Sequence, residues 1–313
     1  MLTRRATLAG AAALASTPAL PASPRKSYDL VPKQVALDLW MIEGSTEYFT
    51  DENGGAIVNV VLAGTDAGLV IVDTGTSLRF GQALSKVAQG LSGRGVAAII
   101  NTHHHPDHFF GNQAFHGVPV YALPTTRIEA QTHGDGFADG LYRILGDWMR
   151  GTEPRPPDTD ISATTLSFGG RKFEVLPLSG HTAADLALLD TATGTLIAGD
   201  LCFLNRAPTT PTADLTVWQQ SLDLIEAAQP AGIIPGHGPL DRTGASISQT
   251  RAYLSWLART LQAAADQGLD MVEVMAADLP AEDASMGAQP QEFIRSVSHL
   301  FPTFEQAALP LAD

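Results

Sequence analysis

Four histidines and one aspartate are concentrated in a single short segment, and these residue types bind metals. An apolar run at 96–100, VAAII, continues directly into NTHHHPDH at 101–108. Neutral imidazole is a preferred nitrogen ligand of zinc in proteins, and carboxylate oxygen joins it around that ion. Burying so many of these groups without a metal would be costly. The segment therefore predicts half of a dinuclear zinc site.

The spacing within this segment divides its side chains between two metal positions. On an extended backbone, residues two apart share a face, which pairs His103 with His105 and turns His104 away. The proline that follows cannot continue a strand, so Asp107 and His108 lie on the next turn and reach a second position. The alternative is a run of solvated histidines, which predicts no matching ligands elsewhere in the chain.

Matching ligands occur downstream, each after an apolar run and a glycine. They are His181 after Gly180, Asp200 after Gly199, and His237 after Gly236. Alone, each would indicate only a surface turn or a helix cap. Together they favour a metal site, because open α/β sheets gather functional groups at strand ends. We expect His181 to complete the first site and His237 the second, while the two oxygens of Asp200 bridge both cations.

The remaining patterns indicate the elements that position these residues. Strands are expected at 35–42, 56–62, 69–72, 97–101, 164–168, 172–177, 187–189, 195–198 and 233–234. Helices are expected at 80–91, 215–228, 245–265 and 290–307. Strands interleaved with helices predict an α/β layered fold.

The ligand pattern resembles that of the metallo-β-lactamase superfamily, with HxHxDH at 103–108 followed by the Gly-His, Gly-Asp and Gly-His pairs. The resemblance covers about 32–238 and implies a four-layer αββα sandwich with two Zn²⁺ at one edge. The implied metal ligands are His103, His105, His181, Asp107, His108, Asp200 and His237. The segment IVDTG at 71–75 also matches, which implies that Asp73 supports the site from behind the ligands. Asp107 and Asp200 are the expected catalytic carboxylates.

A narrower resemblance rests on 53–59, 146–154 and 206–211. These segments are similar to the SoxH-like proteins, called quinoprotein relay system zinc metallohydrolases. That likeness implies a periplasmic zinc hydrolase, with quinoprotein or sulfur-oxidation proteins as partners and no defined substrate. A bridging Asp200 resembles glyoxalase-II-like thioesterases and lactonases, and disfavours β-lactamase activity. Persulfide dioxygenases of this fold hold one iron with fewer ligands, so an iron or mixed iron and zinc site is the alternative.

Composition agrees with one globular enzyme domain. The 313 residues are 44% hydrophobic and 17% charged, and we expect the hydrolase domain, with C-terminal helices, over 28–313. A net charge of −14 excludes a nucleic-acid partner. The single cysteine, Cys202, excludes an internal disulfide and is expected in the core, so we assign it no role.

The first 22 residues have the layout of a signal peptide. Arg4 and Arg5 precede an Ala-rich run over 6–15, and small residues follow. The arginine pair is also typical of twin-arginine signals. We therefore expect a periplasmic protein, without stable membrane insertion because the apolar run is too short to span a bilayer.

Two segments are expected to contact a small-molecule substrate. The loop at 45–55 carries Tyr48 and Phe49, which are candidates for a lid. In 136–150 an apolar helical stripe ends with Trp148. Core packing is the default interpretation of this stripe, and pocket lining by Trp148 is the alternative.

The expected chemistry is hydrolysis by a metal-bridging hydroxide. Zinc lowers the pKa of bound water from about 15.7 to roughly 7, and the hydroxide would attack an ester, thioester or similar carbonyl. The chain has neither a Gly-x-Ser-x-Gly nor a His-Glu-x-x-His motif, so no other hydrolytic centre competes. The alternative from another class is a metal-dependent binding or maturation factor for a quinoprotein system.

Overall fold

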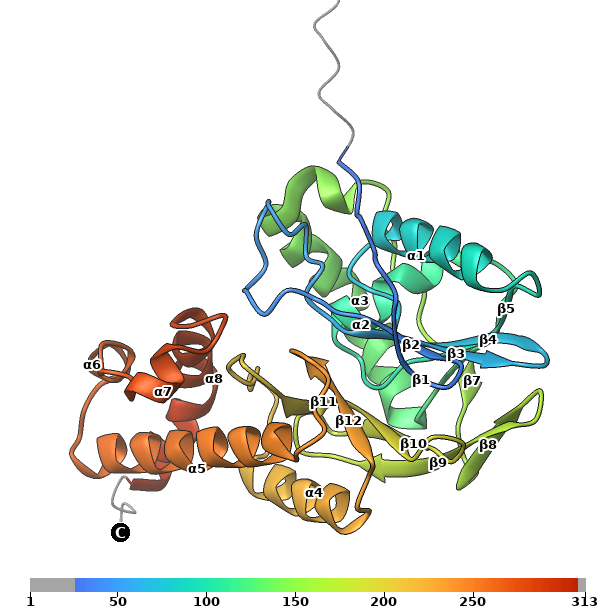
Figure 1. Cartoon of the computed structure of the whole chain (residues 1–313). Helices are drawn as coiled ribbons and strands as arrows, with labels where there is room; N and C mark the ends of the chain where they lie inside the picture. The colour runs from blue at the N-terminus through green and yellow to red at the C-terminus, as the bar shows by residue number, and fades with distance from the viewer. Residues whose placement is uncertain (1–25, 309–313) are drawn as a thin grey trace, which may run out of the picture.

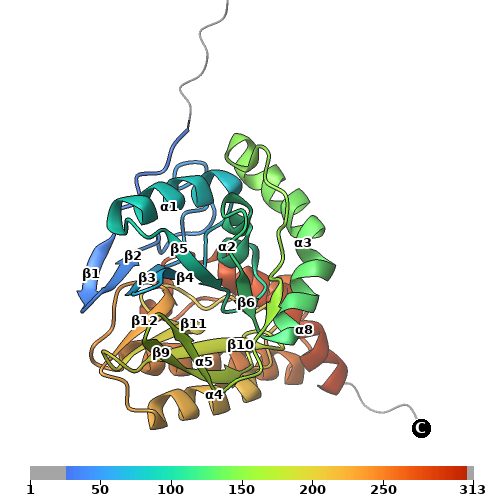
Figure 2. The same ribbon diagram turned by 90° about the vertical axis from the view of Figure 1, so that its right-hand side faces the viewer.

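Two β-sheets lie face to face at the centre of the computed structural model, and helices cover the outer face of each sheet (Figure 1, Figure 2). The structure describes residues 26–308. The expected signal peptide, 1–22, and the final residues, 309–313, lie outside this range. The arrangement is the four-layer αββα sandwich that the sequence predicts, so the expected fold class is confirmed.

The first sheet has seven strands in chain order and changes from antiparallel to parallel halfway across. The strands are β1 (Lys33–Ala36), β2 (Leu39–Ile42), β3 (Val60–Thr65), β4 (Gly68–Val72), β5 (Val96–Ile100), β6 (Val120–Ala122) and β7 (Thr159–Asp160). Neighbours are antiparallel from β1 to β4 and parallel from β4 to β7. The carboxyl ends of the parallel strands share one edge, where β5 leads into the histidine-rich segment.

The second sheet has five strands. They are β8 (Thr165–Phe168), β9 (Arg171–Leu178), β10 (Asp185–Asp190), β11 (Thr195–Phe203) and β12 (Gly232–His237), in the spatial order β12-β11-β10-β9-β8. Only β11 and β12 are parallel among these described strands. This pair brings Asp200 and His237 to the same edge as the end of β5.

Helices complete the two outer layers. The first sheet is covered by α1 (Leu78–Leu91), α2 (Pro106–Phe109) and α3 (Pro124–Leu145), with the short 3₁₀ helices η1 (Phe110–Ala114) and η2 (Gly146–Met149). The second sheet is covered by α4 (Leu215–Ala227) and α5 (Ala245–Asp266). The C-terminal helices α6 (Met271–Met275), α7 (Ala281–Ala284) and α8 (Gln291–Ala308) gather beside one end of α5 (Figure 1). None of the helices within 26–308 is both long and apolar enough to cross a bilayer.

Apolar side chains of both sheets fill the interior between them. Val70, Val72 and Ile100 of the first sheet and Leu186 and Leu188 of the second are at most 1% exposed. Fully burying a side chain of this kind stabilises the fold by about 1.5–3 kcal/mol. The sheets that carry the site are therefore rigidly packed against each other.

The helix α1 shows how the sequence fixes an outer layer. The Ser77 side chain accepts a hydrogen bond from the Phe80 backbone N–H at 3.1 Å and so caps the helix. Phe80, Leu84 and Ala88 recur every four residues and are buried against the sheet. The helix expected at 80–91 is thus found with its start two residues earlier.

Two strand expectations are corrected by the structure. The single strand expected over 35–42 is the hairpin of β1 and β2, because Asp38 adopts a left-handed φ of 49° and turns the chain without a glycine. The strand expected over 195–198 continues to Phe203, so Asp200 lies inside β11 and not in a turn behind it. Gly199, with φ 52°, lies at an irregularity in the pairing of β11 with β12.

Candidate metal centre

Histidine and aspartate side chains from four separate segments converge at one edge of the sandwich. They form two groups whose possible ligand atoms lie within 4.8 Å of one another: His103, His105, His181 and Asp200 in the first, and Asp107, His108 and His237 in the second. The structure thus brings together every residue that the sequence proposes as a ligand. Both groups are chemically able to hold a metal ion.

Three imidazole nitrogens of the first group surround one point. His103 Nε2 lies 3.1 Å from His105 Nδ1 and 3.2 Å from His181 Nε2. His181 Nε2 lies 2.9 Å from His105 Nδ1. Nitrogens bound to a tetrahedral zinc at about 2.0–2.1 Å stand about 3.3 Å apart. The three nitrogens therefore have nearly the mutual spacing of zinc ligands.

Asp200 lies between the two groups and directs one carboxylate oxygen toward each. Oδ2 is 3.3 Å from His181 Nε2 and 3.9 Å from His103 Nε2. Oδ1 is 3.2 Å from His108 Nε2 and 3.3 Å from His237 Nε2. A carboxylate held in this way can bridge two cations.

Asp107 completes the second group. Its Oδ2 lies 3.7 Å from His108 Nε2 and 3.5 Å from His237 Nε2. Within residues 26–308, His108 Nε2 and Asp200 Oδ1 are buried and have no hydrogen-bond partner. Buried polar atoms are normally satisfied, so this pair of atoms fits a cation. The donor set as a whole, imidazole nitrogen with carboxylate oxygen, suits zinc.

The ends of strands place the histidines of the centre, whereas Asp200 lies inside β11. β5 stops at Ile100, and a short loop carries His103 and His105 before Pro106 starts α2. His181 follows the end of β9, and His237 is the last residue of β12. Gly236 is required beside it, because a Cβ there would stand 1.9 Å from Asp200 Oδ1.

Asp73 supports the second group from behind. Its Oδ2 accepts hydrogen bonds from His108 Nδ1 and from Thr102 Oγ1, both at 2.8 Å, and its Oδ1 accepts one from the Thr102 backbone N–H at 2.9 Å. With Nδ1 of His108 as the donor, Nε2 of that ring presents a lone pair to the metal position. The carboxylate is 2% exposed and its backbone has a φ of 59°.

Two other ligand rings are oriented in the same manner. His237 Nδ1 donates to the Ile57 carbonyl at 2.8 Å, which leaves Nε2 free to bind. His103 Nδ1 lies 3.1 Å from Thr102 Oγ1, whose own proton is directed to Asp73. These contacts fix the tautomers and ring planes before any metal is bound.

Burial keeps the histidines of the first group neutral. It lowers the pKa of His103 and of His105 well below the usual range, and it lowers the pKa of His181 to about 4. Neutral rings keep the lone pair that a metal needs. At neutral pH the first group is therefore ready for zinc without losing a proton.

The second group is dominated by carboxylates. Burial opposes a charge on His108, but the charges of Asp200, Asp73 and Asp107 outweigh burial and raise the His108 pKa well above its usual value. Burial likewise opposes ionisation of Asp200, yet His237 and His108 hold its pKa well below the usual range. A divalent cation would replace the proton on His108 and would be stabilised by the same carboxylates.

His104 points away from both groups, as the alternation along the segment predicts. It is 4% exposed, and its ring stacks on Phe137 of α3 at 6.0 Å between centroids. Burial lowers its pKa to about 4. Its packing explains why the middle one of three adjacent histidines is tolerated without being part of either group.

A cavity of about 350 Å³ opens onto the metal centre. Its walls include Tyr48 and Phe49, the two lid candidates of the 45–55 loop. Its apolar lining also includes Phe137, Leu141 and Ile144 of α3. His105, Asp107, Asp200 and His237 form the metal side of this cavity. A small molecule in the cavity would thus contact both groups.

Trp148 is absent from this lining within the described part of the chain. Its indole lies in η2, is 7% exposed, and donates from Nε1 to the Asp51 carbonyl at 2.8 Å. The ring packs against Tyr28 at 4.5 Å, and a Cβ at Gly54 would stand 2.5 Å from it. These are the contacts of a packing residue, so the default interpretation of the stripe holds for Trp148 and its proposed place in the substrate pocket is corrected.

Sequence reasoning missed one wall of the cavity, which comes from α8 and from the chain after β11. The residues concerned are Arg206, Thr209, Glu292, Arg295 and His299. Arg206 and Thr209 lie within the segment 206–211 that carries the narrower resemblance, but nothing in the ligand pattern points to α8. Contacts between segments more than 80 positions apart, such as Thr209 with Glu292 at 2.9 Å, become visible only in the folded chain.

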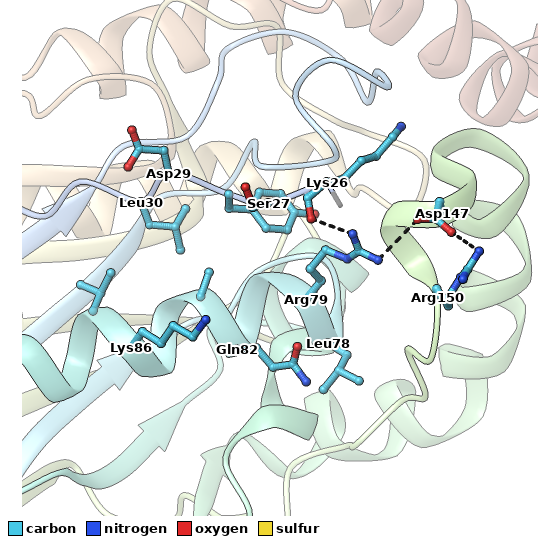
Figure 3. A pocket seen from close by; sticks show the side chains of 13 residues that line it. Lys26, Ser27, Asp29, Leu30, Leu78, Arg79, Gln82, Lys86, Asp147 and Arg150 are labelled. Carbon is cyan, nitrogen blue, oxygen red and sulfur yellow. Dashed lines mark hydrogen bonds and ion pairs between the residues drawn. The ribbon is translucent and has the colours of Figure 1, made fainter. Parts of the chain in front are cut away.

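A larger hollow, of about 1240 Å³, lies between the N-terminal segment, α1 and η2 (Figure 3). Three of its charged side chains contact one another, because Asp147 lies beside both Arg79 and Arg150, and Arg79 also donates to the Lys26 carbonyl at 2.7 Å. It shares no lining residue with the cavity at the metal centre. We therefore assign the chemistry to the smaller cavity.

A four-layer sandwich with a His- and Asp-rich centre at one edge defines a class of metallohydrolases. A family model described as the metallo-beta-lactamase superfamily matches residues 53–237, and the chain belongs to this superfamily. The match includes both groups of ligands. The chain is therefore a superfamily hydrolase with a site able to bind metal ions.

Two curated relatives are similar over part of the chain. The linear primary-alkylsulfatase of Pseudomonas sp. (strain ATCC 19151) is 26% identical over 211 residues, which are 55% of this chain and 39% of that protein. The hydroxyacylglutathione hydrolase of Synechococcus sp. (strain JA-2-3B'a(2-13)) is 31% identical over 121 residues, or 38% of this chain and 39% of that protein. The chain thus spans about two fifths of the length of each relative.

Solved structures share the fold at low identity. The metallo-beta-lactamase from Pontibacter korlensis has a TM-score of 0.60 at 23% identity, covering 72% of this chain and 99% of its own. A beta-lactamase domain protein from Burkholderia ambifaria has a TM-score of 0.64 at 19% identity, covering 88% of each chain. These likenesses show the fold, and the substrate has to be inferred from the residues of the site.

Proposed function

We propose that this chain is an exported hydrolase that uses two zinc ions to cleave an ester, a thioester or a similar carbonyl compound. The position of Asp200 carries this proposal. One of its oxygens lies 3.3 Å from His181 Nε2 and the other 3.3 Å from His237 Nε2, so a single carboxylate joins the two groups. A carboxylate in that place can bind both cations, one through each oxygen.

The chain's own groups have distinct tasks in the proposed reaction. Zinc, when bound, supplies a nucleophile from water near neutral pH and polarises the substrate carbonyl. Asp107 lines the cavity and is 6% exposed, so its carboxylate can accept a proton from the attacking water and return it to the leaving group. Asp200 holds the two halves of the site at a fixed separation.

The apolar wall of the cavity favours substrates with an acyl or alkyl portion. Phe49 and Phe137 face the same space as the ligands, and an apolar substrate portion in contact with them displaces water from the reacting atoms. The names of both curated relatives describe hydrolases, one of alkyl sulfates and one of hydroxyacylglutathione, which supports ester or thioester cleavage. The resemblance to glyoxalase-II-like thioesterases and lactonases that Asp200 carries disfavours lactam hydrolysis.

The proposed location is the periplasm. It rests on the signal-like sequence of residues 1–22, and the proposed association with quinoprotein or sulfur-oxidation proteins rests on the SoxH-like resemblance. Fractionation of cells that express the full chain tests the location. The mature protein should appear in the periplasm, and replacing Arg4 and Arg5 by lysine should retain it in the cytoplasm if export uses the twin-arginine route.

The function is tested by metal analysis and by turnover on a panel of esters, thioesters, lactones and lactams. Protein purified from the periplasm should contain two zinc ions per chain and should hydrolyse a thioester or an ester. Chelation and His105→Ala should each abolish turnover, because His105 Nδ1 lies 3.1 Å and 2.9 Å from its two neighbouring ligand nitrogens. His116→Ala, which removes an exposed histidine, is the matched control and should leave turnover unchanged.

Two results would contradict the proposal. The zinc-loaded protein could be inactive on the whole panel. It could contain one iron and consume oxygen, which would indicate a dioxygenase. A His105→Ala variant that loses hydrolysis yet fully supports the growth that depends on a quinoprotein partner would instead dismiss the alternative, a binding or maturation factor that uses the metal site.

A further inference from the structure

Two arginines share one carboxylate in the wall of the cavity opposite α3. Glu292 is fully buried, and its Oε1 accepts hydrogen bonds from Arg206 Nη2 at 3.3 Å and from Thr209 Oγ1 at 2.9 Å. Arg295 Nη1 donates to Oε1 and Oε2 of the same carboxylate at 3.2 Å and 3.0 Å. Arg206 is only 1% exposed, and its Nη1 and Nη2 donate to the Glu47 carbonyl and to Glu292, while its Nε has no partner within residues 26–308.

The charges in this wall do not cancel. Arg206 and Arg295 carry two positive charges against the one negative charge of Glu292. The other carboxylates of the cavity, Asp107 and Asp200, face the histidines of the metal centre. One positive charge therefore remains on the wall of a cavity in a protein whose net charge is −14.

Arg295 is the arginine that can present this charge to a ligand. Its side chain is 35% exposed, and among the described residues only its Nη1 has a hydrogen-bond partner. The edge formed by Nε and Nη2 is therefore open, and this edge can bind a carboxylate through two parallel hydrogen bonds. The ring of Tyr48 lies 5.7 Å from the guanidinium and limits its movement.

Arg295 lies on α8, outside the residues that the family model matches. The family match ends at residue 237, and α8 begins at Gln291. α8 is attached to the site by the Arg206 and Thr209 contacts with Glu292 and by a hydrogen bond of 2.7 Å between Thr210 and Ser296. Arg295 and His299, one helical turn apart, both line the cavity.

We propose that Arg295 binds an anionic end of the substrate, so that the substrates are esters or thioesters that carry a carboxylate or a similar oxyanion. This inference rests on the proposed function. The reacting carbonyl would lie at the metal centre, the apolar chain against Phe137 and Ile144, and the oxyanion at the open edge of Arg295. Arg295 is then a specificity residue, and Glu292 is a positioning residue that orients its guanidinium.

Binding of a thiol series tests this proposal without requiring turnover. The probes are ω-mercapto carboxylic acids of three to eight carbons and the matching primary amides, whose thiol can bind the metal of the purified protein. Calorimetric titration of the protein as isolated should show that at least one acid binds about tenfold more tightly than its amide. Arg295→Gln should remove that preference and leave amide binding unchanged.

Controls separate recognition from folding. Arg259→Gln, at an exposed arginine of α5 outside the cavity, should retain the full preference for the acid. Arg295→Lys should retain only part of it, because an ammonium group lacks the two parallel donors. Thermal unfolding of Arg295→Gln shows whether the loss arises from disorder of α8, which would also weaken binding of the amides.

Two outcomes would overturn the proposal. In the first, acid and amide bind equally at every chain length in the unaltered protein, or no probe binds at all. In the second, Arg295→Gln keeps the preference for the acid. A protein that prefers the acids but hydrolyses nothing would instead refute the hydrolase and leave the anion subsite in place.

Discussion

Replacing Asp73 by asparagine should weaken the second metal position and leave the first nearly intact. The carboxylate receives three hydrogen bonds, from His108 Nδ1, Thr102 Oγ1 and the Thr102 backbone N–H, at 2.8, 2.8 and 2.9 Å. An amide has only one acceptor oxygen, so its NH₂ group must face at least one of these donors. The ring of His108 then turns or changes tautomer, and Nε2 no longer presents its lone pair.

The expected magnitude follows from the role of such a group. Loss of a partner behind a metal-ligating histidine typically costs 10–100-fold in metal affinity, or about 1.4–2.7 kcal/mol. The backbone is not expected to contribute, because asparagine tolerates the φ of 59° as well as aspartate does. Competition with a chromophoric chelator resolves the two binding steps. The affinity of the second group should fall by this factor. The affinity of the first group should fall by less than about threefold, since His181 and His105 do not contact Asp73 and His103 is connected to it only through Thr102 Oγ1.

Asp38→Asn is the matched control, because Asp38 also has a positive φ, of 49°, but lies in the exposed turn between β1 and β2. It should leave both binding steps unchanged. The reasoning is refuted if Asp73→Asn binds both metals as tightly as the unaltered protein. It is also refuted if both steps weaken equally, which would mean that Asp73 supports the whole centre and not His108.

Three further predictions concern other parts of the site. Gly236→Ala places a Cβ 1.9 Å from Asp200 Oδ1, so it should lower the free energy of unfolding by about 1–3 kcal/mol and should also lower activity. A variant with the thermal unfolding and the turnover of the unaltered protein would contradict this prediction. Burial lowers the pKa of His181 to about 4, so between pH 6.5 and 4 the unfolded chain binds a proton that the folded metal-free protein does not. The contribution of His181 should therefore lower the free energy of unfolding by up to about 3 kcal/mol as the pH falls through this range. In denaturant titrations with chelator present, His181→Asn should make this pH dependence shallower, whereas an unaltered slope would show that His181 is not buried as described. Trp148→Phe removes the hydrogen bond to Asp51 and should cost about 1 kcal/mol of stability without changing kcat/KM; a change in KM alone would return Trp148 to the substrate pocket.

The ligands could be predicted from the sequence because each follows an element that is locally recognisable. The alternation of His103 and His105 and the proline that starts α2 are short-range signals, and the fold brings their partners to the same edge. The exception was Asp200, which lies within β11 because that strand continues past the irregularity at Gly199. Its role did not depend on this detail, since both oxygens still face the two groups.

The wall of the cavity could not be predicted in the same way. Glu292 and Arg206 are 86 positions apart, and their contact depends on how α8 packs beside the chain after β11. The amphipathic pattern of α8 predicts a helix but does not say which element it contacts. Likewise, the apolar stripe that ends at Trp148 had no sequence feature to separate packing from pocket lining, and the Asp51 contact decides it.

The central claim is that Asp200 joins two metal positions, and X-ray absorption at the zinc edge of the zinc-loaded protein tests it most directly. The account predicts two zinc ions per chain, nitrogen and oxygen ligands only, and a zinc–zinc distance of about 3.5–4 Å. Asp200→Ala should remove the zinc–zinc signal. A single zinc without a neighbouring metal in the unaltered protein, or an unchanged zinc–zinc distance in Asp200→Ala, would contradict the account.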